Sequence, residues 1–325
     1  MAVEHRVFQG QPFPAAILMV PSAADPLAAW LRERLGIELI GRATVGGGCI
    51  HGAWALRTAA AGPLFAKTNR ADRLPLLEAE AEGLGALKRV APRGLEIPEP
   101  LACGLAGELA VLVLPWLDFS RGADHPNAWE DCGANLARLH RLSLQAHAME
   151  EGNVRFGWRS DNFIGTSPQV NEWQDNWATF FSDCRLRPQL RWLAAKGQLL
   201  RGADQLLEAL PPWLKGHVPE PCLVHGDLWS GNAALLSRSG GSLFDPAIYR
   251  GDREVDLAMA RLFKGFPQAF FKGYNDEWPL PDGWRERVDL YNLYHLLNHA
   301  NLFGGGYINQ AQTVIDSLLG LMVRI

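Results

Sequence analysis

The stretch LVHGDLWSGN, residues 223–232, and the shorter FDPA, residues 244–247, decide the interpretation of this chain. Together they place Asn232 five residues after Asp227, and Asp245 thirteen residues after Asn232. One acid can accept a proton, while an amide oxygen and a second carboxylate are ligands that a hard cation prefers. The spacing therefore predicts a catalytic centre with one proton acceptor and one metal site.

This layout is typical of phosphoryl-transfer centres. Asp227 would orient the attacking hydroxyl and accept its proton late, and Asn232 and Asp245 would hold Mg²⁺. His225 is expected to brace the loop through hydrogen bonds. A lone Asp more often forms a turn or a helix cap, and the three letters HGD could occur by chance. The joint spacing of all three side chains favours transfer of a phosphoryl group from ATP.

The composition excludes several other classes of protein. The chain has 325 residues, 48% of them apolar and 20% charged, with a net charge of −4, so no nucleic-acid partner is expected. No apolar run approaches the roughly 20 residues that span a bilayer, and the start resembles no secretory leader. The five cysteines are widely spaced without a C-x-x-C pair, which favours a reducing, cytoplasmic location.

The first third of the chain predicts a small sheet with one inserted helix. A short amphipathic helix starts at Pro26. The sheet should contain strands at 39–45, 53–57, 64–68, 101–105 and 109–114, with a helix over 74–90 after the third strand.

Beyond a hinge at residues 115–118 the pattern becomes mostly helical. Asn127 and Glu130 form a plausible capping box for a helix to about residue 140. Further helices are expected at 173–184, 188–209, 252–263, 284–302 and 307–323, with short strands at 223–224, 233–236 and 242–244.

The predicted fold class is α+β, a two-lobed protein-kinase-like fold. Residues 1–117 would form the nucleotide-binding lobe, a five-stranded antiparallel sheet plus a helix, after an N-terminal arm. Residues 118–325 would form a mainly helical lobe that carries catalysis and binds the acceptor.

Several residues of the first lobe are candidates for binding ATP. In VGGGCIHG, residues 45–52, glycines let backbone N–H groups approach phosphates, which favours Gly46, Gly47 and Gly48. No Gly-Lys-Ser/Thr follows, so this is not a Walker A loop, and a plain hairpin turn is the alternative.

Lys67 ends the third strand, where it could reach the α- and β-phosphates of ATP. Glu80 in the following helix could pair with it, with Glu78 and Glu82 as rivals; a solvated helix face is the alternative for each. In the hinge, the carbonyl of Pro115 and the N–H of Leu117 would bind adenine.

The chain resembles the fructosamine kinase (ketosamine-3-kinase) family, within the aminoglycoside-phosphotransferase-like kinases. The resemblance runs from about Leu27 to the C-terminus. Its general part is the Gly-rich loop, Lys67 and the two motifs quoted first. Its more specific part is FGWRSDNFIGT at 156–166, followed by Gln169, Asn171, Trp173 and WATFF at 177–181, YRGDREVDLAM at 249–259 and LFGG at 302–305.

The resemblance implies ATP-dependent phosphorylation of the sugar 3-hydroxyl in small or protein-linked ketosamines, as deglycation repair. It implies that Asp227 is the catalytic aspartate, that Asn232 and Asp245 hold the metal, and that Lys67 and Glu80 form the nucleotide-lobe pair. The chain departs from the family at His51, where Asn or Ser is usual, and at the apolar hinge, where an acid is common.

Weaker candidates shape the acceptor pocket or regulate the enzyme. Trp229, Asn162 and Asp252 are candidates for the pocket, although Asp252 and Asp256 could simply cap the helix at 252–263. Cys49 lies in the Gly-rich loop and could oxidise; some relatives suggest an intersubunit disulfide there, so the chain could be a monomer or a homodimer.

Two other functions fit the same residues. One is another small-molecule kinase, acting on an aminoglycoside, choline or a free sugar, because function depends on the acceptor pocket. The other is a catalytically silent ATP-binding protein of the same fold, against which the intact Lys67, Asp227, Asn232 and Asp245 argue.

Overall fold

The computed structural model describes residues 13, 19–22, 24–46, 50–119, 127–150, 155–237, 240–263 and 265–322. The chain divides into two compact units. The first comprises Met1–Leu136, Ser230–Pro246 and Pro267–Tyr274, and the second comprises Ala137–Trp229, Ala247–Phe266 and Asn275–Ile325. The lobe boundary expected at residues 117 and 118 stays a prediction.

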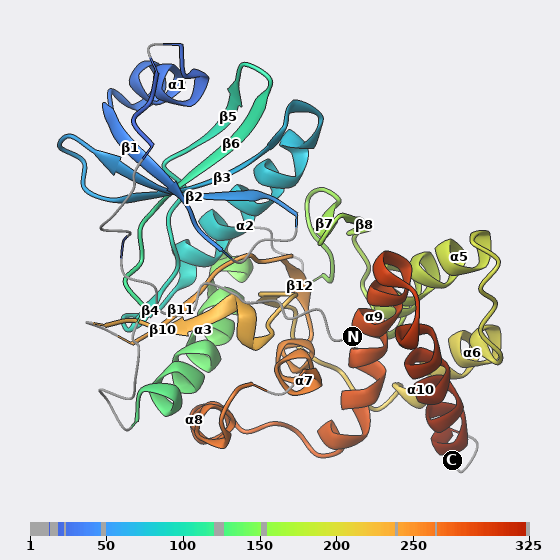
Figure 1. Ribbon diagram of the computed structural model, residues 1–325. Helices are drawn as coiled ribbons and strands as arrows, with labels where there is room; N and C mark the ends of the chain where they lie inside the picture. The colour runs from blue at the N-terminus through green and yellow to red at the C-terminus, as the bar shows by residue number, and fades with distance from the viewer. Residues whose placement is uncertain are drawn as a thin grey trace. The chain divides into compact units, whose positions relative to one another are not determined.

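The first unit is built on a five-stranded antiparallel sheet, which confirms the expected sheet (Figure 1). Its spatial order is β1-β2-β3-β6-β5. The strands are β1 (Leu39–Thr44), β2 (Gly52–Thr58), β3 (Leu64–Arg70), β5 (Ala102–Ala106) and β6 (Leu109–Pro115). A smaller sheet in the same unit joins β10 (Ala233–Leu235), β11 (Gly241–Leu243) and β4 (Leu95–Glu96).

Helix α1 (Pro26–Leu35) covers one face of the main sheet. It begins where the Asp25 carboxylate accepts the backbone N–H groups of Leu27 and Ala28, and it ends at Gly36 in the left-handed conformation. Its Trp30 and Leu31 pack with Ala66, Val111 and Val113 of the sheet. Helix α2 (Leu74–Val90) starts with a proline in its first turn and packs on β3, β5 and β6.

Side chains along a strand alternate between the two faces of a sheet. Because Ala66 packs toward α1, its neighbour Lys67 points to the opposite face, where it meets α2. The alternation of β3 thus places a lysine against a helix that carries acids.

Two glycines let α3 (Ala128–Glu150) and α8 (Gln268–Glu277) approach each other closely within the first unit. A Cβ on Gly133 would lie 1.9 Å from the carbonyl oxygen of Phe270, and one on Gly273 would lie 1.9 Å from that of Glu130. The two backbones therefore touch where no larger residue fits.

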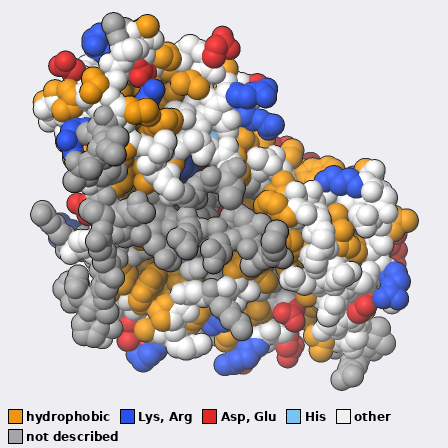
Figure 2. All heavy atoms as spheres, in the orientation of Figure 1, with side chains coloured by type: hydrophobic (Ala, Val, Ile, Leu, Met, Phe, Trp, Pro, Cys, Tyr) orange, Lys and Arg blue, Asp and Glu red, His pale blue; other side chains and the backbone are white. Residues whose placement is uncertain are grey.

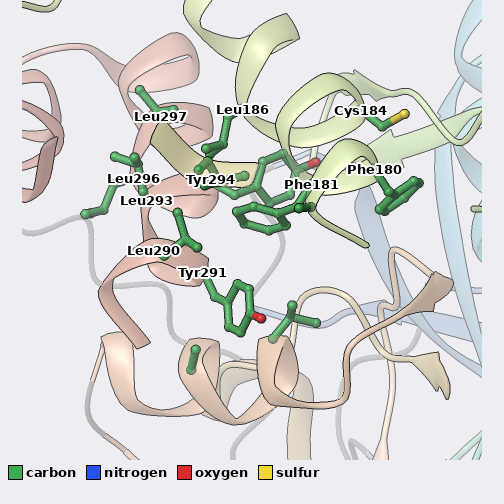
Figure 3. Close-up of a cluster of buried hydrophobic side chains, with 14 of the residues drawn as sticks. Phe180, Phe181, Cys184, Leu186, Leu290, Tyr291, Leu293, Tyr294, Leu296 and Leu297 are labelled. Atoms are coloured by element: carbon green, nitrogen blue, oxygen red, sulfur yellow. The ribbon is translucent and has the colours of Figure 1, made fainter. Parts of the chain in front are cut away.

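The second unit is mostly helical around one aromatic-rich core (Figure 3). Trp177 stacks near Phe180 and Phe181, and its indole N–H donates to the Tyr291 hydroxyl at 3.0 Å. Its helices are α4 (Trp177–Phe180), α5 (Arg187–Ala195), α6 (Ala203–Trp213), α7 (Glu254–Leu262), α9 (Trp284–Phe303) and α10 (Gly306–Met322). Its short strand pairs are β7 (Asn162–Ile164) with β8 (Ser167–Gln169), and β9 (Cys222–Val224) with β12 (Tyr249–Gly251).

Several elements differ from the expectation. The single helix predicted over 188–209 is wrong, because the chain breaks after α5 and both Gly197 and Gly202 adopt left-handed backbone angles. The segment Phe181–Leu186 winds as a π-helix between α4 and α5. The sequence analysis did not predict α8. It also did not predict β7, β8 and β12, because three-residue strands are too short to show a local period.

The exterior shows an ordinary mixture of side chains. Among the described residues on the face drawn in Figure 2, acidic and basic side chains are interspersed with apolar ones. Within the described part of the chain, every helix is too short or too polar to cross a bilayer.

We predict that Gly133→Ala destabilises the protein by about 1–3 kcal/mol or more, because the new methyl group would collide with the Phe270 carbonyl. Urea unfolding followed by circular dichroism measures this. Gly85→Ala in α2 is the matched control: its nearest neighbour is a side-chain atom at 3.9 Å, so the change should be neutral or stabilise by up to about 1 kcal/mol. Equal unfolding midpoints for the two variants would contradict the close helix contact.

Candidate active site

Lys67 lies at the centre of the polar cluster of the first unit. Its Nζ is 2.7 Å from Oε1 of Glu80 and 2.5 Å from Oδ1 of Asp245. The lysine and Glu80 are buried, whereas the Asp245 side chain is 41% exposed. Acids from α2 and from the turn beyond β11 thus meet around one ammonium group of β3, and Glu80 is the acid of α2 that makes the pair.

The two carboxylates keep this ammonium charged. Burial alone would lower the pKa of Lys67, but the negative charges of Asp245 and Glu80 outweigh it and raise the pKa above its ordinary value. Burial raises the pKa of Glu80, which the Lys67 ammonium opposes. Removing one member of such a buried pair would leave an uncompensated charge, at a cost of about 3–5 kcal/mol.

His51 also belongs to this cluster. It begins the turn into β2, and its Nδ1 lies 3.0 Å from Nδ2 of Asn69, which also donates to the Ile50 carbonyl. Since the amide nitrogen donates, Nδ1 accepts, and the proton of the neutral ring is on Nε2. Burial lowers the pKa of His51 to about 4, with the Lys67 charge adding to the effect and Asp245 opposing it. His51 is therefore a neutral hydrogen-bonding group near the lysine.

Asp245 and Asn232 lie side by side at the base of β10 and β11. The backbone of Asp245 has φ of +57°, a left-handed conformation that Asp tolerates better than most residues. Nδ2 of Asn232 donates to the Asp245 carbonyl at 3.3 Å, and Phe244 N–H donates to the Asn232 carbonyl at 3.0 Å. This orientation makes Oδ1 of Asn232 the amide oxygen that could ligate a cation beside the Asp245 carboxylate.

In the second unit, Asp256 supports the loop that carries Asp227. Its two carboxylate oxygens accept the backbone N–H groups of His225 and Gly226 at 2.7 and 2.8 Å. His140 adds a third contact from Nε2 at 3.1 Å. Burial would raise the pKa of Asp256, but these bonds and the nearby His140 hold it below its usual range.

The sequence suggests a helix cap as one role for Asp256. The structure shows instead a buried acid that binds the backbone before Asp227. It lies inside α7, among residues 254–260, which are all buried. Its carboxylate is therefore shielded from solvent. An acid inside an apolar helical run is the signal that could have identified it. Gly226 is held equally tightly, since a Cβ there would lie 2.0 Å from the Ala247 carbonyl oxygen.

Asn162 belongs to a buried network behind the same loop. Its Nδ2 donates to the Ile248 carbonyl, and its Oδ1 accepts from Nε2 of Gln169, both at 2.8 Å. Gln169 also donates to the Ala247 carbonyl and accepts the Tyr294 hydroxyl proton. The network ties β7, β8 and α9 to the residues that pair with the Asp227 loop, because Ala247 N–H donates to the His225 carbonyl.

Asp252 lies at the other end of the β9–β12 ladder. Val224, which leads into the Asp227 loop, pairs with Tyr249, whereas Cys222 pairs with Gly251 just before Asp252. Its carboxylate is buried and accepts Nε2 of His217 and the Tyr291 hydroxyl, both at 2.6 Å. The structure therefore does not bring Asp252 next to Asp227.

Of the remaining candidates, Gly46, Pro115 and Leu117 lie at the sheet of the first unit. Gly46 is exposed after β1, and Pro115 and Leu117 lie at and just beyond the end of β6. Trp229 follows the Asp227 loop, and its N–H donates to the Asp227 carbonyl at 3.1 Å. Gly47, Gly48 and Cys49 lie outside the described residues.

Comparisons with known proteins find matches over most of the chain. A family model described as fructosamine kinase matches residues 24–320. A relative from Synechocystis sp., named "Probable ketoamine kinase", is 42% identical over 278 residues, covering 86% of this chain and 90% of the relative. The chloroplastic protein-ribulosamine 3-kinase of Arabidopsis thaliana is 35% identical over 323 residues, covering 96% of this chain and 93% of the relative.

Solved structures show the same fold. A candidate fructosamine-3-kinase from Haemophilus somnus superposes with a TM-score of 0.79 at 27% identity, covering 90% of this chain and 96% of the other. An aminoglycoside phosphotransferase solved with AMP-PNP and hygromycin B has a TM-score of 0.60 at 17% identity, covering 91% and 98%. These likenesses confirm the predicted α+β, two-lobed protein-kinase-like fold class.

We predict that His51 titrates near pH 4 in the folded protein, well below the ordinary value of 6.5, because burial and the Lys67 charge disfavour its protonated form. The unfolded chain binds the proton first as pH falls, so His51 contributes stability above pH 6.5 that is lost as pH falls through 4. A histidine NMR titration, with the signal assigned through His51→Gln, measures the pKa. A midpoint near 6.5 would contradict the buried, neutral ring.

Proposed function

The chain belongs to the fructosamine kinase family, and we propose that it uses ATP to phosphorylate the sugar 3-hydroxyl of ketosamines, the Amadori adducts of sugars on amines. The ketoamine and ribulosamine kinases among its relatives support this substrate class. The observation that carries the proposal is the meeting of Lys67, Glu80 and Asp245, a charge arrangement suited to ATP phosphates. Small and protein-linked ketosamines are both proposed acceptors, and loss of the phosphorylated sugar would free the amine.

The first unit supplies the residues for the nucleotide. Lys67, oriented by Glu80, would contact the α- and β-phosphates, and the backbone at Gly46, Gly47 and Gly48 would contact the phosphates from the turn between β1 and β2. The Pro115 carbonyl would accept a hydrogen bond from the adenine amino group, and the Leu117 N–H would donate to a ring nitrogen. Neutral His51 would donate from Nε2 without adding charge near Lys67.

Asn232 and Asp245 fit Mg²⁺ as the metal of this site. Both present oxygen atoms, the donors that Mg²⁺ prefers, and they are neighbours through the Asn232 amide bond to the Asp245 carbonyl. A bound Mg²⁺ would neutralise charge on the phosphates during transfer. Asp245 would then be shared between Lys67 and the cation.

The second unit supplies the acceptor side of the reaction. Asp227 would accept a hydrogen bond from the sugar 3-hydroxyl and take its proton as the oxygen bonds to the γ-phosphorus and ADP leaves. Asp256 would hold the backbone that leads into Asp227 and so set the position of the proton acceptor. Trp229 and Asn162 are proposed to shape the acceptor pocket, while Asp252 has a structural task with His217 and Tyr291.

We predict ADP release with fructose-lysine or ribulose-lysine, and none above background with choline or hygromycin B. A coupled assay that compares the four acceptors measures this.

Asp227→Asn should lower kcat on the ketosamine by about 10²–10⁴-fold, because the proton acceptor is lost, and leave nucleotide affinity within about two-fold. Wild-type turnover in this variant would remove Asp227 from its role, and equal rates on all four acceptors would refute the substrate class.

We predict that Asp245→Ala weakens nucleotide binding by about 10-fold or more in Mg²⁺, and much less in EDTA, because a metal ligand is lost. Isothermal titration with a non-hydrolysable ATP analogue in both buffers measures this. Asp245→Asn keeps the shape of the side chain and should show the same dependence on Mg²⁺. Asp72→Ala, an exposed acid of the same unit, is the control; an equal loss of affinity with and without Mg²⁺ in the Asp245 variants would rule out a metal role.

A further inference from the structure

A cleft of about 570 Å³ lies in the second unit, between residues 213–220, 252–254 and 278–287. This volume is in the range of small-molecule sites. Asp252, in its wall, follows the end of β12 that pairs with Cys222, whereas the Asp227 loop follows Val224 at the opposite end of the ladder. The cleft is therefore separate from the catalytic loop within this unit.

The cleft has an excess of negative charge. Five carboxylates and two guanidinium groups line it. Both guanidinium groups already have partners: Arg287 forms two hydrogen bonds with Glu254 at 2.7 and 2.8 Å. Arg253 donates to the carbonyls of Trp278 and Pro279 and stacks 3.8 Å from the Trp278 ring. The three remaining acids, Glu220, Asp282 and Glu286, are exposed, so the rim would attract a cation.

His217 adds a hydrogen-bond acceptor to the wall. Its Nε2 lies 2.6 Å from the buried Asp252 carboxylate, which can only accept, so in the neutral ring Nε2 carries the proton. Nδ1 is then the acceptor. The Asp252 carboxylate that accepts this proton is itself held in place, because the Tyr291 hydroxyl donates to the same oxygen. The Tyr291 hydroxyl in turn accepts the indole N–H of Trp177. A ligand with N–H groups could donate to Nδ1.

The same residues could suggest a metal ion, and their bonds argue against it. Ligand atoms of His217, Asp252 and Glu254 lie within 4.8 Å of one another. However, both oxygens of Glu254 are held by Arg287, and Asp252 accepts from His217, Tyr291 and the Glu254 backbone. A metal would have to break these charged contacts, whereas an organic cation would use the rim acids and leave them intact.

The cleft also offers an apolar surface. Trp213 is half-buried and packs against the core, and Pro219 and Val218 continue the lining, with Val218 87% exposed. An aromatic or aliphatic body would cover this surface while its charged end meets the acids. We propose that this cleft binds a protonated organic amine with an apolar body, at a site separate from the catalytic loop.

Isothermal titration of the full chain with phenethylamine tests the proposal. Saturable binding of one equivalent of phenethylamine is expected. Its neutral counterpart, 2-phenylethanol, should bind at least about five-fold more weakly, because it carries no positive charge for the rim carboxylates to attract. The double variant Glu220→Gln/Glu286→Gln should raise the Kd of phenethylamine by about five-fold or more, and Trp213→Leu should also weaken binding. Asp204→Asn/Glu208→Gln, on exposed positions of α6 outside the cleft, is the matched control and should leave Kd within about two-fold.

Four outcomes would overturn the proposal. One is equal affinity for the charged and neutral probes. Another is equal weakening by the two double variants, which would reduce the effect to net charge. The third is displacement of phenethylamine by fructose-lysine in the Asp227→Asn variant, which would place the amine in the acceptor site. Zn²⁺ binding that is lost in His217→Gln, without any response to the amine, would support the metal instead.

Discussion

A buried ammonium group between two carboxylates is the constraint on which the first unit depends. Lys67 points away from the α1 side of the sheet because strand side chains alternate, and it can remain charged only if acids accompany it. Glu80 comes from α2 and Asp245 from the turn beyond β11, so one charge joins β3 to a neighbouring helix and to a segment that is distant in the sequence. The arrangement ties the position of α2 to that of the turn beyond β11, and through Asn232 to the proposed metal.

The second unit also contains a buried charged group, but its partners are of a different kind. Asp256 is a buried acid whose charge is satisfied by backbone N–H groups and His140 instead of by a lysine. Because its two oxygens bind consecutive residues, they define the path of the chain just before Asp227. The Asn162–Gln169–Tyr294 network holds the neighbouring strand from the other side through the Ala247 and Ile248 carbonyls. The chain just before Asp227 is thus held through its backbone N–H groups.

Most of the sheet and the Lys67–Glu80 contact could be predicted from the sequence because their signals are local or nearly so. Strands of five to seven residues are long enough to show as separate runs between turn residues, and Glu80 follows Lys67 by only thirteen residues. What sequence reasoning missed depends on distant partners: β12 exists through its pairing with β9, and Gln169 meets Ala247 at a separation of 78 residues. The role of Asp256 was missed because an acid near a helix start resembles a cap, although the apolar residues that follow it in α7 indicate burial. The break between α5 and α6 was missed because helical spacing continues on both sides of Gly197 and Gly202.

The left-handed backbone of Asp245 has a consequence for how this position can change during evolution. The residues that adopt this conformation most readily are Gly, Asn and Asp, and of these only Asp carries a charge. Glu would keep the charge, but it would adopt the conformation less readily and would carry its oxygens one carbon further from its own backbone. Two independent demands therefore fall on this one residue: the backbone conformation favours a small set of side chains, and the neighbouring Lys67 ammonium favours the charged member of that set.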